Sequence, residues 1–266
     1  VYLILFKEIL FNKEGPVATI TLNNPERYNA LGPTISSELL SALVMCRKDR
    51  EIRVVVLTGS GKAFCSGGDI SYFEKFAVSD PSEPVRQLLD PLHRIVLEIR
   101  QMPKPVLAVI NGAVSGAGMS LAFACDLRLC SSQARFKQAY TSLGLAPDVG
   151  WSLWVGLLAG FSKAAEMVFL DPVYSADQAL AMGLVHRVVE PEKLEESARA
   201  WIEQLATGAT HSFACAKADL NHAFLTLLER QLEVERKGVL EASTTSDYQE
   251  GLKAFRAKRK PDFKGY

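Results

Sequence analysis

The chain has 266 residues, of which 48% are hydrophobic and 23% are charged, a composition typical of a globular protein with a large core. Thirty Lys and Arg residues balance thirty Asp and Glu residues, so no net field favours nucleic acid or an anionic membrane as a partner. The five cysteines are scattered and odd in number, which indicates buried free thiols rather than a disulfide framework or a zinc site. We therefore expect no metal, and any anion site must be local.

The first third of the chain alternates predicted strands and helices. Residues 1–11 are apolar but too short to cross a bilayer, and we expect a strand there and another at 17–22. A helix is predicted from Ile35 with Thr34 as its N-cap, and the apolar run 54–57 predicts a strand buried on both faces. We expect a cytoplasmic protein, although a targeting segment upstream of Val1, and with it an organellar matrix, stays open.

Two glycine-rich segments, 62–70 and 111–126, each follow a predicted strand and precede a predicted helix. Glycine lets a ligand approach the backbone closely, and a helix start leaves N–H groups unpaired, so an anionic oxygen could be held at either segment. The alternative is a tight turn with small residues for packing. The glycine spacing does not match a dinucleotide fingerprint, which argues against a nicotinamide or flavin cofactor.

The rest of the chain divides into two parts. A loop is predicted at 79–84, a helix carrying His93 then ends before Pro103, and strands are predicted at 105–110 and 184–189. Ser175 and Gln178 form a capping box for a helix. After Glu190 only helical spacing remains, so the order is a strand-and-helix body followed by a helical tail.

Four separated segments, 23–31, 62–70, 104–126 and 247–261, together resemble the crotonase superfamily, that of enoyl-CoA hydratases and isomerases. The resemblance covers nearly the whole chain. It implies an α/β fold in which residues 1–190 form a ββα spiral core that binds acyl-CoA, and residues 191–266 form an all-helical trimerisation region that completes the CoA site. It also implies a homotrimer or a dimer of trimers, with no cofactor apart from the coenzyme A of the acyl-CoA thioester substrate.

The resemblance assigns the backbone N–H groups of Gly68 and Ala117 to the thioester oxygen. An enolate next to a thioester places negative charge on that oxygen, and preorganised donors stabilise it, each by roughly 2.7–4 kcal/mol. Ala30, Ser66 and Ile70 are expected near the adenine and pantetheine. Asp69 directly follows Gly68 in the first glycine-rich segment and is expected to bind substrate as well.

The resemblance also places cationic and aromatic side chains at the nucleotide. Arg27, and Phe255 with Lys258 from the tail or from a neighbouring subunit, are expected to hold phosphates or adenine by charge pairing and stacking. For Arg27 and Lys258 the alternative is a solvated surface charge.

The family's hydratases use two glutamates, and the matching positions here are Ser120 and Tyr140. Neither replaces a carboxylate base, since an unperturbed tyrosine titrates near pH ~10. Asp148 matches the position where isomerases of the family carry a single acidic base, and one carboxylate suffices to move a proton along a dienolate. The wider sequence also resembles ring isomerases acting on phenylacetyl-CoA-derived epoxides. The alternative for Asp148 is an N-cap of the helix that contains Trp151.

Other readings stay open. His93 and Asp148 match positions used by aromatic-acyl-CoA dehalogenases, although Tyr140 stands where those enzymes carry tryptophan. Asp148 alone would be the acid or base of a hydratase or hydrolase. A catalytically idle acyl-CoA-binding protein is the non-enzymatic alternative.

Overall fold

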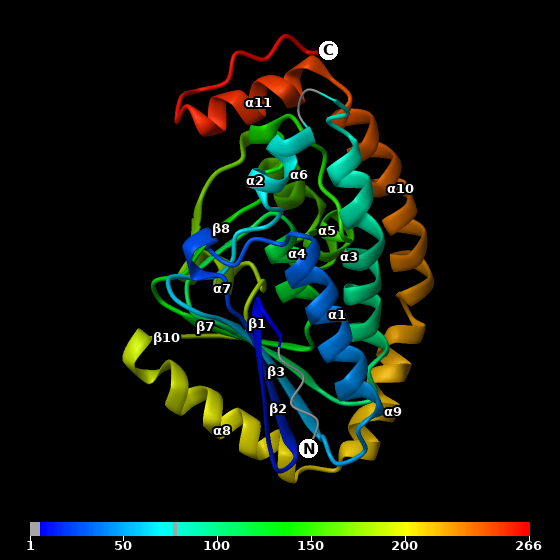
Figure 1. Cartoon of the computed structure of the whole chain (residues 1–266). Helices are drawn as coiled ribbons and strands as arrows, with labels where there is room; N and C mark the ends of the chain where they lie inside the picture. The colour runs from blue at the N-terminus through cyan, green and yellow to red at the C-terminus, as the bar shows by residue number, and fades with distance from the viewer. Residues whose placement is uncertain (1–5, 77–78) are drawn as a thin grey trace.

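The computed structural model describes residues 6–76 and 79–266, in which the strands form two sheets (Figure 1). The larger sheet is parallel except for the hairpin of its first two strands, and in spatial order it consists of β1 (Ile9–Glu14), β2 (Val17–Leu22), β3 (Val54–Gly59), β5 (Val106–Ile110), β7 (Leu127–Ser131) and β10 (Arg187–Val189). The smaller sheet consists of β4 (Ala63–Cys65), β6 (Ala113–Ser115), β8 (Arg135–Lys137) and β9 (Tyr174–Ser175).

Helices cover both faces of the larger sheet. The α-helices of the described residues are α1 (Pro33–Lys48), α2 (Ile70–Phe73), α3 (Glu83–Gln101), α4 (Ala117–Ala124), α5 (Trp151–Ala159), α6 (Phe161–Leu170), α7 (Ala176–Ala181), α8 (Leu194–Thr207), α9 (Thr210–His222), α10 (Leu225–Ser243) and α11 (Ser246–Arg256). Helices α1 and α3 pack side by side over the main core, whereas α8 packs against the opposite face of β3, β5 and β7 (Figure 1). The continuous apolar runs of β3 and β5 follow from this two-sided cover.

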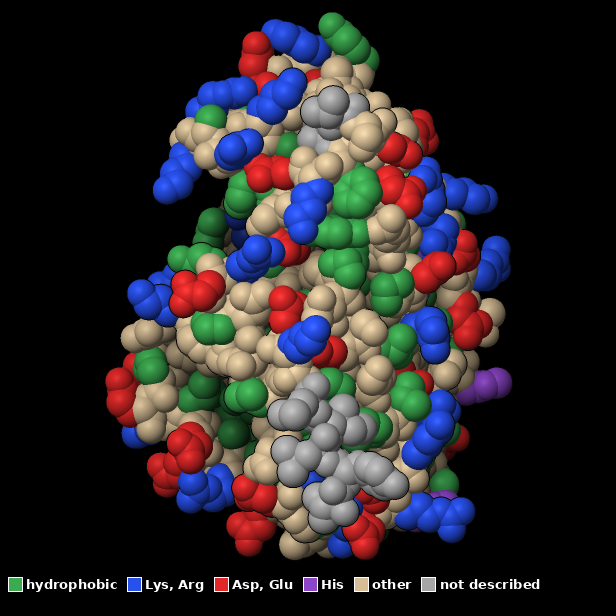
Figure 2. All heavy atoms as spheres, in the orientation of Figure 1, with side chains coloured by type: hydrophobic (Ala, Val, Ile, Leu, Met, Phe, Trp, Pro, Cys, Tyr) green, Lys and Arg blue, Asp and Glu red, His purple; other side chains and the backbone are tan. Residues whose placement is uncertain are grey.

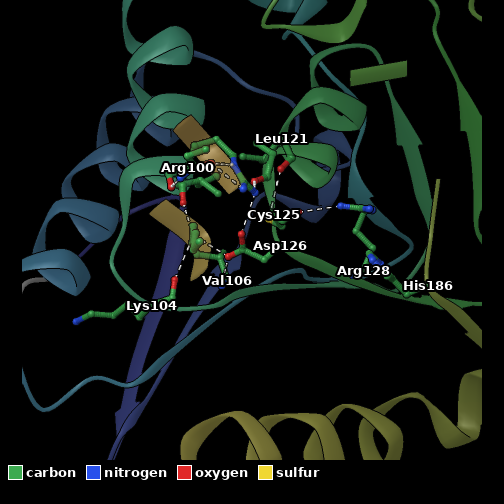
Figure 3. A network of polar contacts seen from close by, with 12 residues as sticks. Arg100, Lys104, Val106, Leu121, Cys125, Asp126, Arg128 and His186 are labelled. Atoms are coloured by element: carbon green, nitrogen blue, oxygen red, sulfur yellow. Dashed lines mark hydrogen bonds and ion pairs between the residues drawn. The ribbon is translucent and has the colours of Figure 1, made fainter. Parts of the chain in front are cut away.

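A buried polar network fastens α9 to the body of the molecule. Arg100 of α3 donates to Asp126 at 2.9 Å and to the Asn221 side chain, while Lys217 donates to the other Asp126 oxygen at 2.7 Å. Figure 3 shows Arg100 and Asp126 pointing toward one another below the helix that carries Leu121. Each buried charge has an opposite partner, so α9 is fixed to the sheet-bearing part of the chain.

Several element boundaries differ from the sequence predictions. The first strand is β1 (Ile9–Glu14), later than predicted, and residues 1–5 of that prediction lie outside the described residues. Helix α1 begins at Pro33 with Gly32 as N-cap, so the Thr34 cap is wrong because proline already suits the first helical position. The predicted loop 79–84 already contains the start of α3 at Glu83, and strand 184–189 shortens to β10. The Ser175–Gln178 capping box is confirmed.

Within residues 6–76 and 79–266, no helix is both long enough and apolar enough to cross a bilayer.

Candidate active site

A cavity of about 550 Å³ lies between the two glycine segments, α2, α3 and the C-terminal helices α10 and α11. Its wall from α2, α3, α10 and the 140–148 segment is apolar and contains Phe73, Val85, Leu88, Leu92, Leu145 and Val239. The remaining lining is mostly backbone and polar side chains from both glycine segments. A cavity with one apolar wall and a few polar groups is typical of a small-molecule site.

The smaller sheet brings the two glycine segments together. Strand β4 pairs in parallel with β6, and the Ser115 hydroxyl donates to the Ser66 carbonyl oxygen at 2.9 Å. A side chain at Gly118 would place its Cβ 2.3 Å from the Cys65 carbonyl oxygen, so only glycine permits this contact. Segments some fifty residues apart in sequence therefore line one wall of the cavity.

Gly68 and Ala117 both line this cavity. Gly67 O accepts from Leu31 and Asp69 N–H donates to Leu31, but within residues 6–76 and 79–266 the Gly68 N–H donates no hydrogen bond. Ala117 is the first residue of α4, where a helical N–H has no intrahelical acceptor, and its N–H likewise donates none among these residues. Two backbone donors at one cavity thus remain available to an oxygen of a ligand.

Asp148 lines the same cavity although only 7% of its surface is exposed. Its Oδ1 accepts a hydrogen bond of 2.7 Å from the Tyr140 hydroxyl. Burial, reinforced by the negative charge of Glu235, raises the pKa of Asp148 to about 7, although the bond from Tyr140 acts in the opposite direction. A carboxyl that exchanges its proton near neutral pH is suited to general acid–base chemistry.

Tyr140 and Ser120 both contact Asp148 but differ in their access to the cavity. Tyr140 lines it, and burial together with Asp148 raises the pKa of its hydroxyl well above the usual value, so this hydroxyl stays a donor. Ser120 is fully buried outside the lining, and its hydroxyl donates to the Asp148 backbone oxygen at 3.2 Å. Both residues therefore support Asp148 in this structure.

The alternative role of Asp148 as a helix cap is wrong. The N-cap of α5 is Gly150, and the carboxylate that accepts from the start of this helix belongs to Glu235 of α10, with Gly150 N–H at 2.6 Å and Ser152 N–H at 2.9 Å. Glu235 is buried, and no sequence motif pointed to it. Glu235 is more than eighty residues away from Asp148 along the chain, and only the tertiary structure brings the two residues close together.

The polar mouth of the cavity contains most of the residues predicted to bind the nucleotide. Ala30, Ser66 and Ile70 line it, as does Arg27, whose guanidinium donates to Asp69 at 2.9 Å. The Asp69 carboxylate also caps α2. Asp69 therefore lines the cavity but is already bound on both oxygens.

Of the two tail residues predicted to bind the nucleotide, one lines the cavity and the other does not. Phe255 of α11 lines the cavity of its own chain, so no neighbouring subunit is needed to bring it there, whereas Lys258 is exposed and does not line it. Figure 2 shows Lys and Arg side chains gathered over α11 and the segment that follows it. Those in the last turn of α11 and beyond it are Lys253, Arg256, Lys258, Arg259, Lys260 and Lys264.

His93 lies outside the cavity lining, on the side of α3 that meets α10. Arg236 donates to its Nδ1 at 3.2 Å, and burial together with the positive charge of Arg236 lowers the pKa of His93 to about 4. A neutral histidine held by arginine away from the cavity cannot act with Asp148. The structure therefore gives the dehalogenase-like pairing of these residues no support.

Comparisons with known proteins agree with this architecture. The model of the family described as Enoyl-CoA hydratase/isomerase matches residues 12–266. The chain is 35% identical over 261 residues to 1,2-epoxyphenylacetyl-CoA isomerase of Escherichia coli (strain K12), covering 97% of this chain and 98% of the relative. It is 32% identical over 260 residues to trans-2-decenoyl-[acyl-carrier-protein] isomerase of Streptococcus mutans, covering 98% and 99%.

Relatives named as hydratases are also present, among them a probable enoyl-CoA hydratase of Rhodobacter capsulatus that is 38% identical over 250 residues and covers 94% of this chain and 95% of its own. The crystal structure of an enoyl-CoA hydratase from Mycobacterium avium subsp. paratuberculosis K-10 superposes with a TM-score of 0.89 at 31% identity, covering 98% of this chain and all of that one. Together with the family match over nearly the whole chain, these likenesses establish that the protein belongs to the enoyl-CoA hydratase/isomerase family, with the crotonase fold.

Proposed function

We propose that the protein is an acyl-CoA isomerase that moves a double bond, or rearranges a ring, through an enolate. The thioester oxygen accepts from the N–H groups of Gly68 and Ala117, and Asp148 removes a proton from one carbon and returns it to another. The observation that carries the proposal is the buried carboxyl of Asp148 at the cavity, which pairs with no cation among the described residues and whose pKa is raised to about 7.

The other carboxyl groups of the cavity lining are poorly suited to this work. Glu26 is exposed at the mouth, and Asp69 is bound to Arg27 and to the start of α2. Hydration needs an acid and a base to hold and split one water molecule. Ser120 and Tyr140 occupy the two positions that match the glutamates of the family's hydratases, and neither is a carboxylate. One carboxyl is sufficient for isomerisation because the group that removes a proton from one carbon is the acid that then protonates the other carbon.

We further propose that the carrier of the acyl group is coenzyme A. Arg27 lines the cavity, and several basic residues lie in the last turn of α11 and just after it, close in sequence to Phe255, which also lines the cavity; this favours a ligand with several phosphates. One relative is named for an acyl-carrier-protein substrate and another for a CoA substrate. Both carriers therefore belong in the test.

The test incubates purified protein with 3-enoyl, 2-enoyl and cyclic acyl thioesters in D₂O and H₂¹⁸O, each on coenzyme A and on acyl carrier protein. We expect a positional isomer that carries solvent deuterium at the carbon that Asp148 protonates, and no ¹⁸O in the product. Incorporation of ¹⁸O with loss of the double bond would identify a hydratase, and release of free acid a hydrolase. Tight binding of acyl-CoA without any deuterium uptake would identify an acyl-CoA-binding protein and overturn the proposal.

We also propose that the protein forms a homotrimer or a dimer of trimers. Helices α5 and α6 and the loop after them leave large apolar side chains exposed, which a second copy would cover; these are Leu157, Phe161, Phe169, Leu170 and Val173. Light scattering after gel filtration measures the mass directly. A monomer at micromolar concentration would contradict this proposal.

A further inference from the structure

Glu235 is a second buried carboxylate that lies behind the candidate base. It projects from α10 and accepts from Gly150 N–H at 2.6 Å, from Ser152 N–H at 2.9 Å and from the Ser152 hydroxyl. The Ser152 hydroxyl in turn accepts from the Gln231 amide at 2.9 Å. Glu235 does not line the cavity, so it does not meet the substrate.

These bonds fix an unusual piece of backbone. Val149, between Asp148 and Gly150, has φ of +59°, a conformation that β-branched residues rarely adopt, and Gly150 follows with φ of +80°. A strained residue of this kind persists only where its surroundings hold it. The bond from Gly150 N–H to Glu235 lies immediately after Val149, so Glu235 stabilises the turn that aims Asp148 at the cavity.

The two carboxyl groups also act on each other by charge. Glu235 has backbone and hydroxyl donors that favour its ionised form against the cost of burial, whereas Asp148 has the Tyr140 hydroxyl alone as a side-chain donor. Burial raises the pKa of Glu235 as well, but its larger set of donors lets Glu235 hold a negative charge better than Asp148 does. The neighbouring Arg236 does not neutralise this charge, because it pairs with Asp90, Glu233 and His93.

We infer that Glu235 is a positioning residue for the reaction: through its bonds to Gly150 and Ser152 it holds the turn that carries Asp148, and it places a second carboxylate behind the Asp148 carboxyl. The inference rests on the proposed function only in treating Asp148 as the base. The interaction itself exists whether or not the protein turns over a substrate. It can therefore be measured without turnover.

The first test is a ¹³C NMR titration of the Asp148 side-chain carboxyl carbon, assigned with Asp148→Asn, in the wild type and in Glu235→Gln. Glutamine keeps the shape and one oxygen acceptor but removes the charge. We expect the midpoint of the Asp148 titration to fall by about one pH unit, since removing a nearby like charge favours ionisation. Glu241→Gln is the matched control, because Glu241 is an exposed residue of the same helix, and it should leave the midpoint unchanged.

The second test follows isomerisation as a function of pH. The pH of half-maximal kcat/KM should fall in Glu235→Gln by the same amount as the NMR midpoint. A loss of kcat that is equal at every pH, with an unchanged midpoint, would mean that Glu235 only supports the fold and would overturn the inference. An NMR shift in a protein without isomerase activity would instead uphold the inference and refute the proposed function.

A measurement on the wild type covers the case in which Glu235→Gln does not fold. Because the two carboxyls interact, the Asp148 carbon signal should show a main change at its own midpoint and a second, smaller change at the lower pH where Glu235 takes up its proton. An Asp148 signal that does not respond when Glu235 titrates would overturn the inference.

Discussion

The Tyr140 hydroxyl donates to Asp148 Oδ1 across 2.7 Å inside the apolar wall of the cavity. This bond works against burial: it favours the ionised carboxylate, while the surrounding side chains and Glu235 favour the neutral acid. The balance of these effects places the pKa of Asp148 at about 7, where the group can both take and return a proton.

Asp148→Asn should abolish isomerisation while acyl-CoA binding survives. Asparagine keeps the size of the side chain but cannot take a proton, and general acid–base participation of this kind is worth ~10²–10⁴-fold in rate. Turnover and deuterium exchange next to the thioester report the loss, and calorimetric titration with an acyl-CoA reports binding. If this variant retained full activity, the base would have to be another group.

Tyr140→Phe should move the rising limb of the pH–rate profile to higher pH. Removal of the hydroxyl takes away the hydrogen bond that lowers the pKa of Asp148, so less carboxylate is present at pH 7. Tyr174→Phe is a matched control, because its hydroxyl donates to Glu166 outside the cavity lining. A downward shift, or an equal shift in both variants, would contradict the assigned role of Tyr140.

Ala117→Pro should lower kcat by roughly 10²–10³-fold with little effect on folding. Ala117 is the first residue of α4, where proline costs no intrahelical hydrogen bond, yet proline removes the N–H proposed to hold the thioester oxygen. Ala117→Gly keeps the N–H and serves as the control. Normal turnover by a folded Ala117→Pro protein would exclude this donor.

Asp148→Asn should also stabilise the protein, and more so at high pH. In the unfolded chain Asp148 would ionise near pH ~3.9, but its folded pKa is about 7. The folded state therefore binds the extra proton between these values, and stability falls as the pH rises through this window, by on the order of 3–4 kcal/mol. Asparagine avoids this cost, so thermal unfolding should show a gain in Tm at pH 8 that disappears at pH 4.

His93→Asn should leave turnover unchanged but reduce the sensitivity of the protein to acid. The pKa of His93 lies at about 4 in the folded protein, below its unfolded value of roughly 6.5, so stability falls as the pH drops through this interval, by on the order of 3 kcal/mol. Asparagine can still accept from Arg236 but does not titrate. The fall in Tm between pH 7 and pH 5 should therefore be smaller than in the wild type.

The exposed His222 provides the control for this prediction, since His222→Asn should leave the acid response of Tm as it is. A large loss of turnover in His93→Asn with an unchanged Tm would restore a catalytic role for His93.

Patterns close together in sequence predicted the parts of the fold that depend on local chemistry. The apolar run at 54–57 predicted a strand buried on both faces and the run at 105–110 predicted a strand, and β3 and β5 form there. The Ser175–Gln178 capping box was predicted from residue types three positions apart, and it forms. The exact start of a helix was harder to predict where several residues could serve as the N-cap. Helix α1 begins at Pro33 with Gly32 as its N-cap, and not after the predicted Thr34 cap.

The sequence by itself determined the family, because four separated motifs in one order specify the glycine segments and the lone Asp148 at the base position. Only the tertiary structure decided which charges act on one another. Pairing of β4 with β6 brings Gly68 and Ala117 to one cavity, and packing of α10 brings Glu235 beside Asp148 and holds His93 away from it. Electrostatic effects depend on distance in space and on burial, and neither can be read from positions along the chain.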